Sequence, residues 1–105
     1  MPAVEPDLSG VWKDSERGIL VRLAKAGHSS WLGTAVASPR PPEVGKVIYR
    51  ALRFDPVEKK WVGELLKPED GQVTQVTITL TSPTAMEAVA KVFIFSKTLH
   101  MTRQP

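Results

Sequence analysis

The chain has 105 residues, of which 14 are basic and 11 acidic, giving a formal net charge of +3, and it contains no cysteine. A chain of this length forms about one domain around a single core. Without cysteine, the chain has no disulfides, thiolate metal sites or cysteine nucleophiles. The charges are interleaved rather than clustered and no apolar run is long enough to span a membrane, so we expect a monomer without a nucleic-acid partner or a transmembrane segment.

The amino-terminal residues contain neither a basic region nor an apolar stretch, so they are not an intact secretory signal. We expect residues 1–7 to form a flexible tail and residues 8–105 to form one domain. Two interpretations of the compartment stay open at this point. The protein is either cytoplasmic, or it is a mature exported chain whose signal has been removed.

From Leu8 onward, short runs rich in β-branched and aromatic residues recur about every ten residues, separated by Gly, Pro, Asp and Ser. No stretch has a long helical period. This rhythm predicts an all-β fold, a single eight-stranded antiparallel up-and-down barrel. The predicted strands are Leu8–Lys13, Gly18–Lys25, Ser30–Ala37, Lys46–Phe54, Lys60–Leu66, Val73–Leu80, Ala85–Val92 and a last strand from Phe93 or Ile94 to Arg103.

Most predicted connections are short hairpin turns, but residues 38–45 form a longer one that contains Pro39, Arg40, Pro41 and Pro42. Proline fixes φ and has no amide hydrogen, so this run cannot continue a strand ladder. We expect a stiff loop at one rim of the barrel. Loops of small barrels often carry recognition, which makes this one a candidate partner-binding loop.

Alternation of apolar and polar residues indicates which side chains point inward. In the predicted strand 46–54, Val47, Tyr49 and Ala51 compete with Ile48, Leu52 and Phe54, so its phase stays open. Three other strands have clear inward sets: Ile19, Val21 and Leu23; Val76, Ile78 and Leu80; and Phe93, Phe95, Leu99 and Met101.

Trp12 on the first predicted strand and Arg103 on the last are expected to meet. In a closed barrel these strands are neighbours, so the guanidinium can stack on the indole and bond carbonyls near the chain ends. A cation–π contact of this kind contributes roughly 0.5 to 2 kcal/mol. We interpret the pair as a structural device that closes the barrel.

A Gly-x-Trp on the first strand answered by an Arg on the last resembles the calycin group, which includes lipocalins and fatty-acid-binding proteins. The resemblance extends over nearly the whole chain through the segments 8–13 (LSGVWK), 45–52 (GKVIYRAL), 60–71 (KWVGELLKPEDG) and 96–103 (SKTLHMTR). In this order and spacing they are similar to a bacterial family of small exported proteins catalogued as domain of unknown function 2147. The resemblance implies a lipocalin-like fold, a periplasmic or secreted location and no assigned activity. It supplies no binding residues.

Two features are candidate ligand contacts. Trp61 and Gly63 share a face, where a small residue beside an aromatic one can leave room for a ligand. The alternative is that Gly63 lets a crossing strand pack in a narrow barrel. Lys97 shares its phase with Phe95, and an inward lysine needs an anionic partner.

That partner of Lys97 would be an anionic group of a ligand, or an internal carboxylate such as Glu64 or Glu87. The alternative is a lysine at the rim that extends into water. His28 and His100 lie on different elements without a third metal-ligating neighbour, so we expect no metal. The sequence has no nucleophile elbow, paired catalytic carboxylates or phosphate loop, so we expect neither a cofactor nor an enzyme.

Two functions fit these observations. The first is a non-enzymatic lipocalin-like barrel that binds a small apolar or amphipathic ligand. The second is a protein-interaction or inhibitor module that acts through the 38–45 loop or the amino-terminal tail. Trp12 and Arg103 should occupy one end of the barrel, so a ligand site is expected at the opposite end or on the loop.

Overall fold

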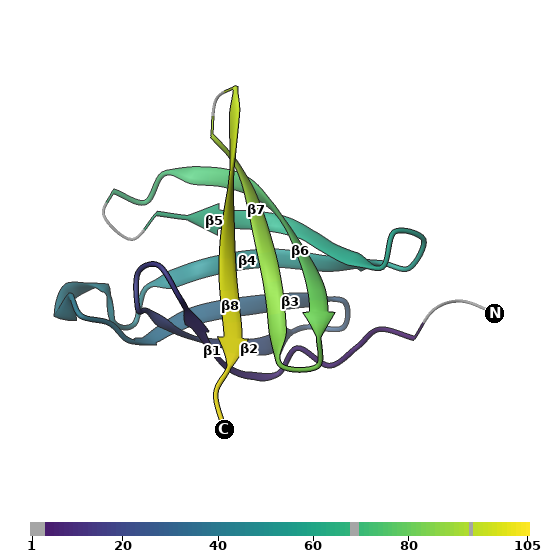
Figure 1. Ribbon diagram of the computed structural model, residues 1–105, viewed down its shortest axis with the longest axis horizontal. Coiled ribbons are helices and arrows are strands. Elements are labelled where there is room, and N and C mark those ends of the chain that lie inside the picture. Colours follow the sequence, from purple (N-terminus) through teal and green to yellow (C-terminus); the bar gives the residue numbers. More distant parts are fainter. Residues whose placement is uncertain (1–3, 68–69, 93) are drawn as a thin grey trace.

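The computed structural model describes residues 4–67, 70–92 and 94–105. Eight antiparallel strands follow chain order around a closed barrel, and β1 pairs with β8 to complete it (Figure 1). The strands are β1 Gly10–Asp14, β2 Leu20–Ala26, β3 Ser30–Ala37, β4 Val47–Asp55, β5 Lys60–Leu66, β6 Val73–Ser82, β7 Ala85–Val92 and β8 Phe95–Arg103, with a 3-10 turn, η1, at Pro41–Glu43. The predicted up-and-down barrel is confirmed.

The predicted strand bounds differ from the observed ones by two residues at most, because turn chemistry marks nearly every connection. The carboxylates of Asp14 and Asp55 each accept the backbone N–H groups of the residues two and three positions later, which folds the chain back after β1 and β4. Gly18 and Gly27 have φ of 73° and 80° in the turns on either side of β2. Phe93, one predicted start of the last strand, lies outside the described residues.

A bulge determines which side chains of β4 point inward, a question that alternation in the sequence leaves undecided. Ala51 has φ of 55°, and the register with β5 shifts between Arg50 and Arg53. A bulge adds one residue to a strand and interrupts the alternation of its side chains. As a result Tyr49 and Leu52 are both buried although they are three residues apart, and neither simple alternation describes this strand.

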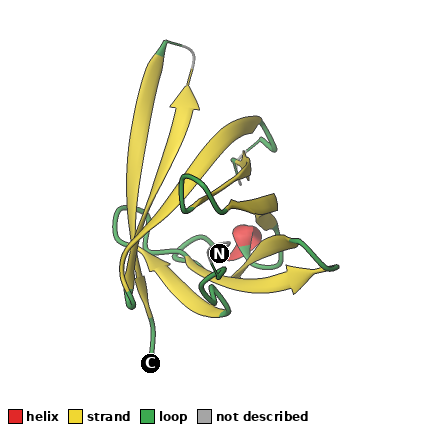
Figure 2. Cartoon of the chain, turned by 90° about the vertical axis from the view of Figure 1, so that its right-hand side faces the viewer, coloured by secondary structure: helices red, strands yellow, loops and turns green. Residues whose placement is uncertain are grey.

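The connections of an up-and-down barrel alternate between its two ends, and here the ends differ. We call the end with the β2–β3, β4–β5 and β6–β7 turns and residues 5–9 the closed end. Figure 2 views this side, where the amino-terminal segment lies across the strands. The other end, with the β1–β2, β3–β4, β5–β6 and β7–β8 connections, we call the open end.

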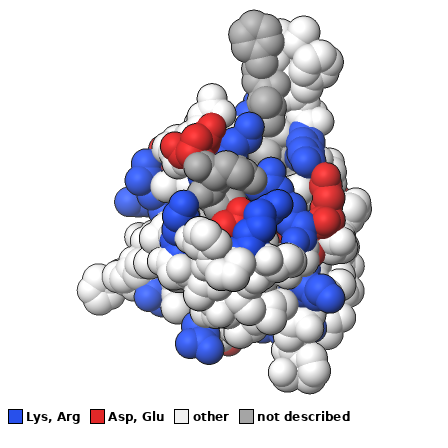
Figure 3. All heavy atoms as spheres, turned by 90° about the vertical axis from the view of Figure 1, so that its left-hand side faces the viewer, with Lys and Arg blue, Asp and Glu red and all other residues white. Residues whose placement is uncertain are grey.

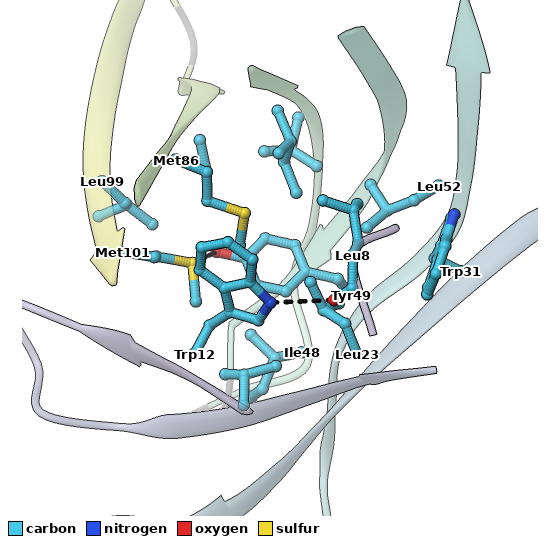
Figure 4. Packing of buried hydrophobic residues seen from close by; sticks show 14 of the residues in the cluster. Leu8, Trp12, Leu23, Trp31, Ile48, Tyr49, Leu52, Met86, Leu99 and Met101 are labelled. Atoms are coloured by element: carbon cyan, nitrogen blue, oxygen red, sulfur yellow. Dashed lines mark hydrogen bonds between the residues drawn. The ribbon is translucent and has the colours of Figure 1, made fainter. Parts of the chain in front are cut away.

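Large apolar side chains fill the closed end and the middle of the barrel. Leu8, Trp12 and Trp61 have no exposed surface, and Trp12 Nε1 donates a hydrogen bond to the Leu8 carbonyl at 3.0 Å. Figure 4 shows the Trp12 indole among Met86, Met101 and Tyr49. The buried apolar cluster consists of Leu8, Trp12, Ile19, Val21, Leu23, Trp31, Ala35, Ile48, Tyr49, Leu52, Trp61, Val76, Ile78, Met86, Ala88, Ala90, Leu99 and Met101.

The segment before β1 is attached to the barrel rather than separate from it. We expected a flexible tail over residues 1–7, but the Glu5 carboxylate bonds to barrel side chains and the Asp7 carbonyl accepts a hydrogen bond from Arg103. Residues 1–3 lie outside the described part of the chain. Among the described residues, no helix is long and apolar enough to cross a membrane.

Candidate functional site

A cavity of about 320 Å³ opens at the open end of the barrel. This volume lies at the lower limit of pockets that hold small organic ligands. The lining residues come from β1, β2 and β4 to β8 and from their connections, so the cavity continues the barrel interior toward solvent. They are Asp14, Arg17, Ile19, Val21, Ile48, Tyr49, Leu65, Leu66, Lys67, Thr74, Ala90, Phe95, Lys97 and Leu99.

The cavity is apolar inside and charged at its mouth. Val21, Ile48 and Ala90 form part of the buried wall, whereas Arg17 and Lys97 belong to the rim. Figure 3 shows the side of the molecule with the β1–β2 and β5–β6 connections, where Lys and Arg side chains gather among fewer acidic ones. Such a gradient suits a molecule with an apolar body and a polar end.

Asp14 holds one side of the mouth in place. Its carboxylate is buried and accepts the backbone N–H groups of Glu16 and Arg17 at 2.9 and 3.2 Å. These bonds satisfy part of the buried charge, whose desolvation would otherwise be costly. A Cβ at Gly18 would lie 3.4 Å from Cγ of Pro39, so the β1–β2 turn also lies against the β3–β4 loop.

Tyr49 places a neutral hydroxyl in the cavity wall region. Burial of the phenol raises its pKa well above the ordinary value, and the nearby Asp14 charge raises it further. Its hydroxyl donates to the Met101 sulfur at 3.4 Å, a weak acceptor. Tyr49 is therefore a hydrogen-bond donor at neutral pH, with a partner that a stronger acceptor could replace.

Lys97 lies at the mouth of the cavity, in the position that fits the rim interpretation. Its Nζ is 3.0 Å from Glu16 Oε1, and both side chains are about half exposed. The two carboxylates suggested from the sequence are not its partners. Glu64 pairs with Arg50 at 2.7 Å, and Glu87 lies 3.7 Å from Nδ1 of His100.

The expected inward position of Phe95 is wrong. The side chain of Phe95 is 70% exposed, although part of it borders the cavity mouth. The β7–β8 hairpin extends past the neighbouring strands, because β6 pairs with β7 only as far as Ala90 and β1 reaches β8 only at Met101 to Arg103. Alternation alone cannot bury a residue where no second layer faces it.

Trp61 and Gly63 do not line the cavity. A Cβ at Gly63 would lie 2.8 Å from the carbonyl oxygens of Arg50 and Ala51, in the bulge of β4. The glycine therefore lets the bulged strand approach closely, which is the packing alternative rather than the ligand one. Trp61 is fully buried toward the closed end, with its ring centroid 4.9 Å from that of Phe54.

The predicted contact between Trp12 and Arg103 is present. The two residues are register partners in the β1–β8 pairing, and the guanidinium carbon lies 4.4 Å from the indole centroid. Arg103 also donates to the carbonyls of Ser9 at 2.6 Å, Asp7 at 2.9 Å and Pro83 at 3.2 Å. One side chain thus joins the amino-terminal segment, the β6–β7 turn and the last strand at the closed end.

Glu5 is a second anchor at the closed end, and sequence reasoning missed it. Its Oε2 accepts the indole N–H groups of Trp31 at 2.5 Å and Trp61 at 2.9 Å, and its Oε1 lies 3.2 Å from Nζ of Lys25. Burial alone would raise the pKa of Glu5, but the bonds from Trp31, Trp61 and Lys25 together lower it. Pairing of a tail carboxylate with two distant indoles has no local signal.

The loop 38–45 is exposed at the open end and is held by its own side chains. Glu43 is buried, accepts the Ser38 hydroxyl at 2.7 Å and pairs with Nε of Arg40 at 2.8 Å. The Ser38 hydrogen bond is the main cause of a lowered Glu43 pKa. The predicted candidate residues Pro39, Arg40, Pro41 and Pro42 are all on the surface of this loop.

Within residues 4–67, 70–92 and 94–105, no three His, Asp or Glu side chains are grouped so that they could hold a metal ion. Comparison of the chain with protein-family models, with curated proteins and with solved structures finds no match.

Proposed function

We propose that this chain is a non-enzymatic, lipocalin-like binding protein that takes a small apolar or amphipathic molecule into the cavity at its open end. The observation that carries the proposal is the cavity itself, about 320 Å³ of space continuous with the barrel interior. Small barrels usually fill their interior with side chains. Here that filling stops short of one end.

The distribution of polar groups favours an amphipathic ligand over a wholly apolar one. An apolar body would contact Val21, Ile48 and Ala90, while a polar end at the mouth would meet Arg17 and Lys97. Apolar burial supplies affinity and the few polar groups fix orientation in sites of this type. The Lys97–Glu16 pair is exposed and weak, so an anionic ligand group could replace Glu16 at low cost.

The proposed relationship to lipocalins rests on the residues at the closed end. Gly10, with φ of 124°, places its backbone against Arg103, since a Cβ there would lie 3.5 Å from Nη1. The Gly10-x-Trp12 sequence on the first strand and Arg103, stacked on Trp12 from the last strand, are the features that resemble the calycin group. From this resemblance we propose a periplasmic or secreted location.

A second candidate function is protein binding through the 38–45 loop. The observation in its favour is the exposed surface formed by Pro41, Pro42 and the half-exposed Val44. Replacing Pro41 and Pro42 by serine should abolish capture of such a partner and leave ligand affinity unchanged. The opposite result would assign the function to the cavity.

The test of the cavity uses Ala90→Leu, which adds apolar volume to the buried wall. The fluorescent probe 8-anilinonaphthalene-1-sulfonate and the ten-carbon pair decanoate and decanol report on occupancy and on preference for an anionic end. We expect saturable probe binding to the natural chain, displacement by decanoate and at least tenfold weaker binding to Ala90→Leu.

The matched control is Ala26→Leu, which makes the same change on an exposed residue at the β2–β3 turn. It should bind the probe as the natural chain does. Trp12, Trp31 and Trp61 do not line the cavity, so their fluorescence is not a suitable readout. If the natural chain binds none of the three compounds, or if Ala90→Leu binds the probe as tightly as the control, the proposal fails.

A further inference from the structure

The tip of the β7–β8 hairpin is the most prominent apolar projection on the described surface. Ile94 is 81% exposed and Phe95 is 70% exposed. The described ends of β7 and β8 lie beyond the other strands in Figure 1. Exposure of neighbouring large apolar side chains to water is unfavourable, and such patches are typical of surfaces that bind a partner.

Lysines stand directly behind this tip. Lys91 is exposed and faces Ser96 across the hairpin, while Lys97 faces Ala90. The stretch from Ala88 to Leu99 contains these two lysines and no acidic residue. At a bilayer interface, acyl chains lie below a layer of anionic headgroups. Apolar side chains at the tip, followed along the hairpin by lysines, fit this arrangement.

The rest of the open end supports the same partner. Among the described acidic residues there, Asp14 and Asp70 accept turn amides, Glu43 is paired with Arg40, and Glu16 is paired with Lys97. Lys67 lies at the cavity mouth, and no described carboxylate approaches it to within 4.0 Å. Among the described residues, basic side chains thus outnumber acidic ones at this end of the barrel, and Figure 3 shows more Lys and Arg than Asp and Glu on this side.

We infer that the open end docks on an anionic lipid membrane, with Ile94 and Phe95 inserted at the interface and Lys91 and Lys97 at the headgroups. Phe95 also borders the cavity mouth, so docking would place the mouth against the lipid. Binding is peripheral and reversible, because two apolar side chains anchor far less than a spanning segment does. The inference does not depend on a ligand occupying the cavity.

The test is sedimentation of the protein with large unilamellar vesicles, made either of phosphatidylcholine alone or of an equimolar mixture with phosphatidylglycerol. The natural chain should bind the anionic vesicles, and added salt should weaken the binding. The double variant Ile94→Ser/Phe95→Ser should bind about tenfold to a hundredfold more weakly. Lys91→Gln should lower the partition coefficient about fivefold.

Two matched controls make these changes elsewhere. Val57→Ser alters a residue that is 85% exposed in the β4–β5 turn at the closed end, and Lys13→Gln alters an exposed lysine on β1. Both should bind vesicles as the natural chain does. All the altered side chains are exposed, so the variants should fold, and thermal unfolding monitored by circular dichroism checks this.

Three results would overturn the inference: no binding of the natural chain to anionic vesicles, equal binding to neutral ones, or unchanged binding of the double variant. Sedimentation velocity without lipid tests whether the tip instead binds a second copy of the protein. If the natural chain self-associates and the double variant is monomeric, the tip is a protein interface instead. Vesicle binding by Ala90→Leu separates this inference from the proposed function, since a filled cavity should leave docking intact.

Discussion

The same strands reach both ends of the barrel, but the interior is filled at one end and contains a cavity at the other. At the closed end, Trp12 and Trp61 fill the interior, and Arg103 and Glu5 tie the amino-terminal segment across it. At the open end, smaller residues such as Val21 and Ala90 line a cavity. Substitutions at the closed end should therefore destabilise the fold more than substitutions at the open end.

The difference has a physical source in side-chain size and in the chain ends. A barrel of fixed strand number has a nearly fixed radius, so large aromatic residues fill one level and small ones leave space at another. The chain also crosses only one end before entering β1, where Leu8 is fully buried. The substitutions below test this contrast, from the largest expected effect to the smallest.

Trp12→Ala should cause the largest loss of stability, about 3 to 5 kcal/mol, because it removes a buried indole and the surface on which Arg103 stacks. Urea denaturation followed by circular dichroism measures it. Trp12→Phe, which keeps a ring, should lose less. A loss below about 1 kcal/mol for the alanine variant would mean that the closed end does not dominate stability.

Gly63→Ala should cost about 1 to 3 kcal/mol, because its Cβ would meet backbone atoms of the β4 bulge at 2.8 Å. The backbone of a paired strand cannot move aside without breaking its ladder. Gly33→Ala is the comparison, since its Cβ would meet only side-chain atoms, the nearest 2.9 Å away on Leu23. Equal losses in the two variants would show that the bulge is not rigid.

Arg103→Lys should lower stability by about 1 to 2 kcal/mol while keeping the charge. A lysine cannot reproduce the planar fork that reaches the carbonyls of Asp7, Ser9 and Pro83 while stacked on Trp12. Thermal unfolding measures the change. A variant as stable as the natural chain would indicate that charge alone suffices at this position.

Glu5→Gln should lower stability by about 1 kcal/mol near neutral pH and reduce the acid sensitivity of the fold. Its folded pKa is lowered, so its contribution is present above the unfolded value of about 4.5 and is lost as pH falls through the folded pKa. Stability measured from pH 7 to pH 3 should therefore fall less steeply in the variant.

Asp7 and Glu43 also have lowered pKa values, which is why the slopes of the natural chain and the Glu5→Gln variant must be compared directly. These two carboxylates contribute equally to both proteins. Parallel curves for the two proteins would show that the Glu5 carboxylate is not coupled to folding.

Ala90→Leu should have the smallest effect, within about 1 kcal/mol in either direction, since the cavity accepts added methyl groups without displacing packed atoms. Urea denaturation is again the measurement. A loss of several kcal/mol would place Ala90 in a filled region and erase the contrast between the ends.

Much of the architecture was predictable because its determinants are local. Strand and turn positions follow from β-branched runs and from turn residues such as Asp14 and Gly27, and the inward phase of Val76 and Ile78 follows from strict alternation. The meeting of Trp12 and Arg103 followed from closure, which makes the first and last strands neighbours.

The open-end site was harder to predict. The rim position of Lys97 was one of two alternatives in the sequence, and Phe95 was assigned to the wrong side. Trp61 and Gly63 suggested a ligand wall, whereas the glycine makes room for the β4 bulge. In each case the deciding partner lies on an element distant in sequence.

The sequence by itself thus determined the order of the strands, their turns and the closing pair Trp12 and Arg103, since each depends on backbone preferences or on chain order. Only the tertiary structure decided the bulge at Ala51, the indole bonds of Glu5 and the cavity beside Ala90. These features depend on side-chain volumes and backbone shifts contributed by several strands that are distant in sequence. They cannot therefore be predicted from any single strand.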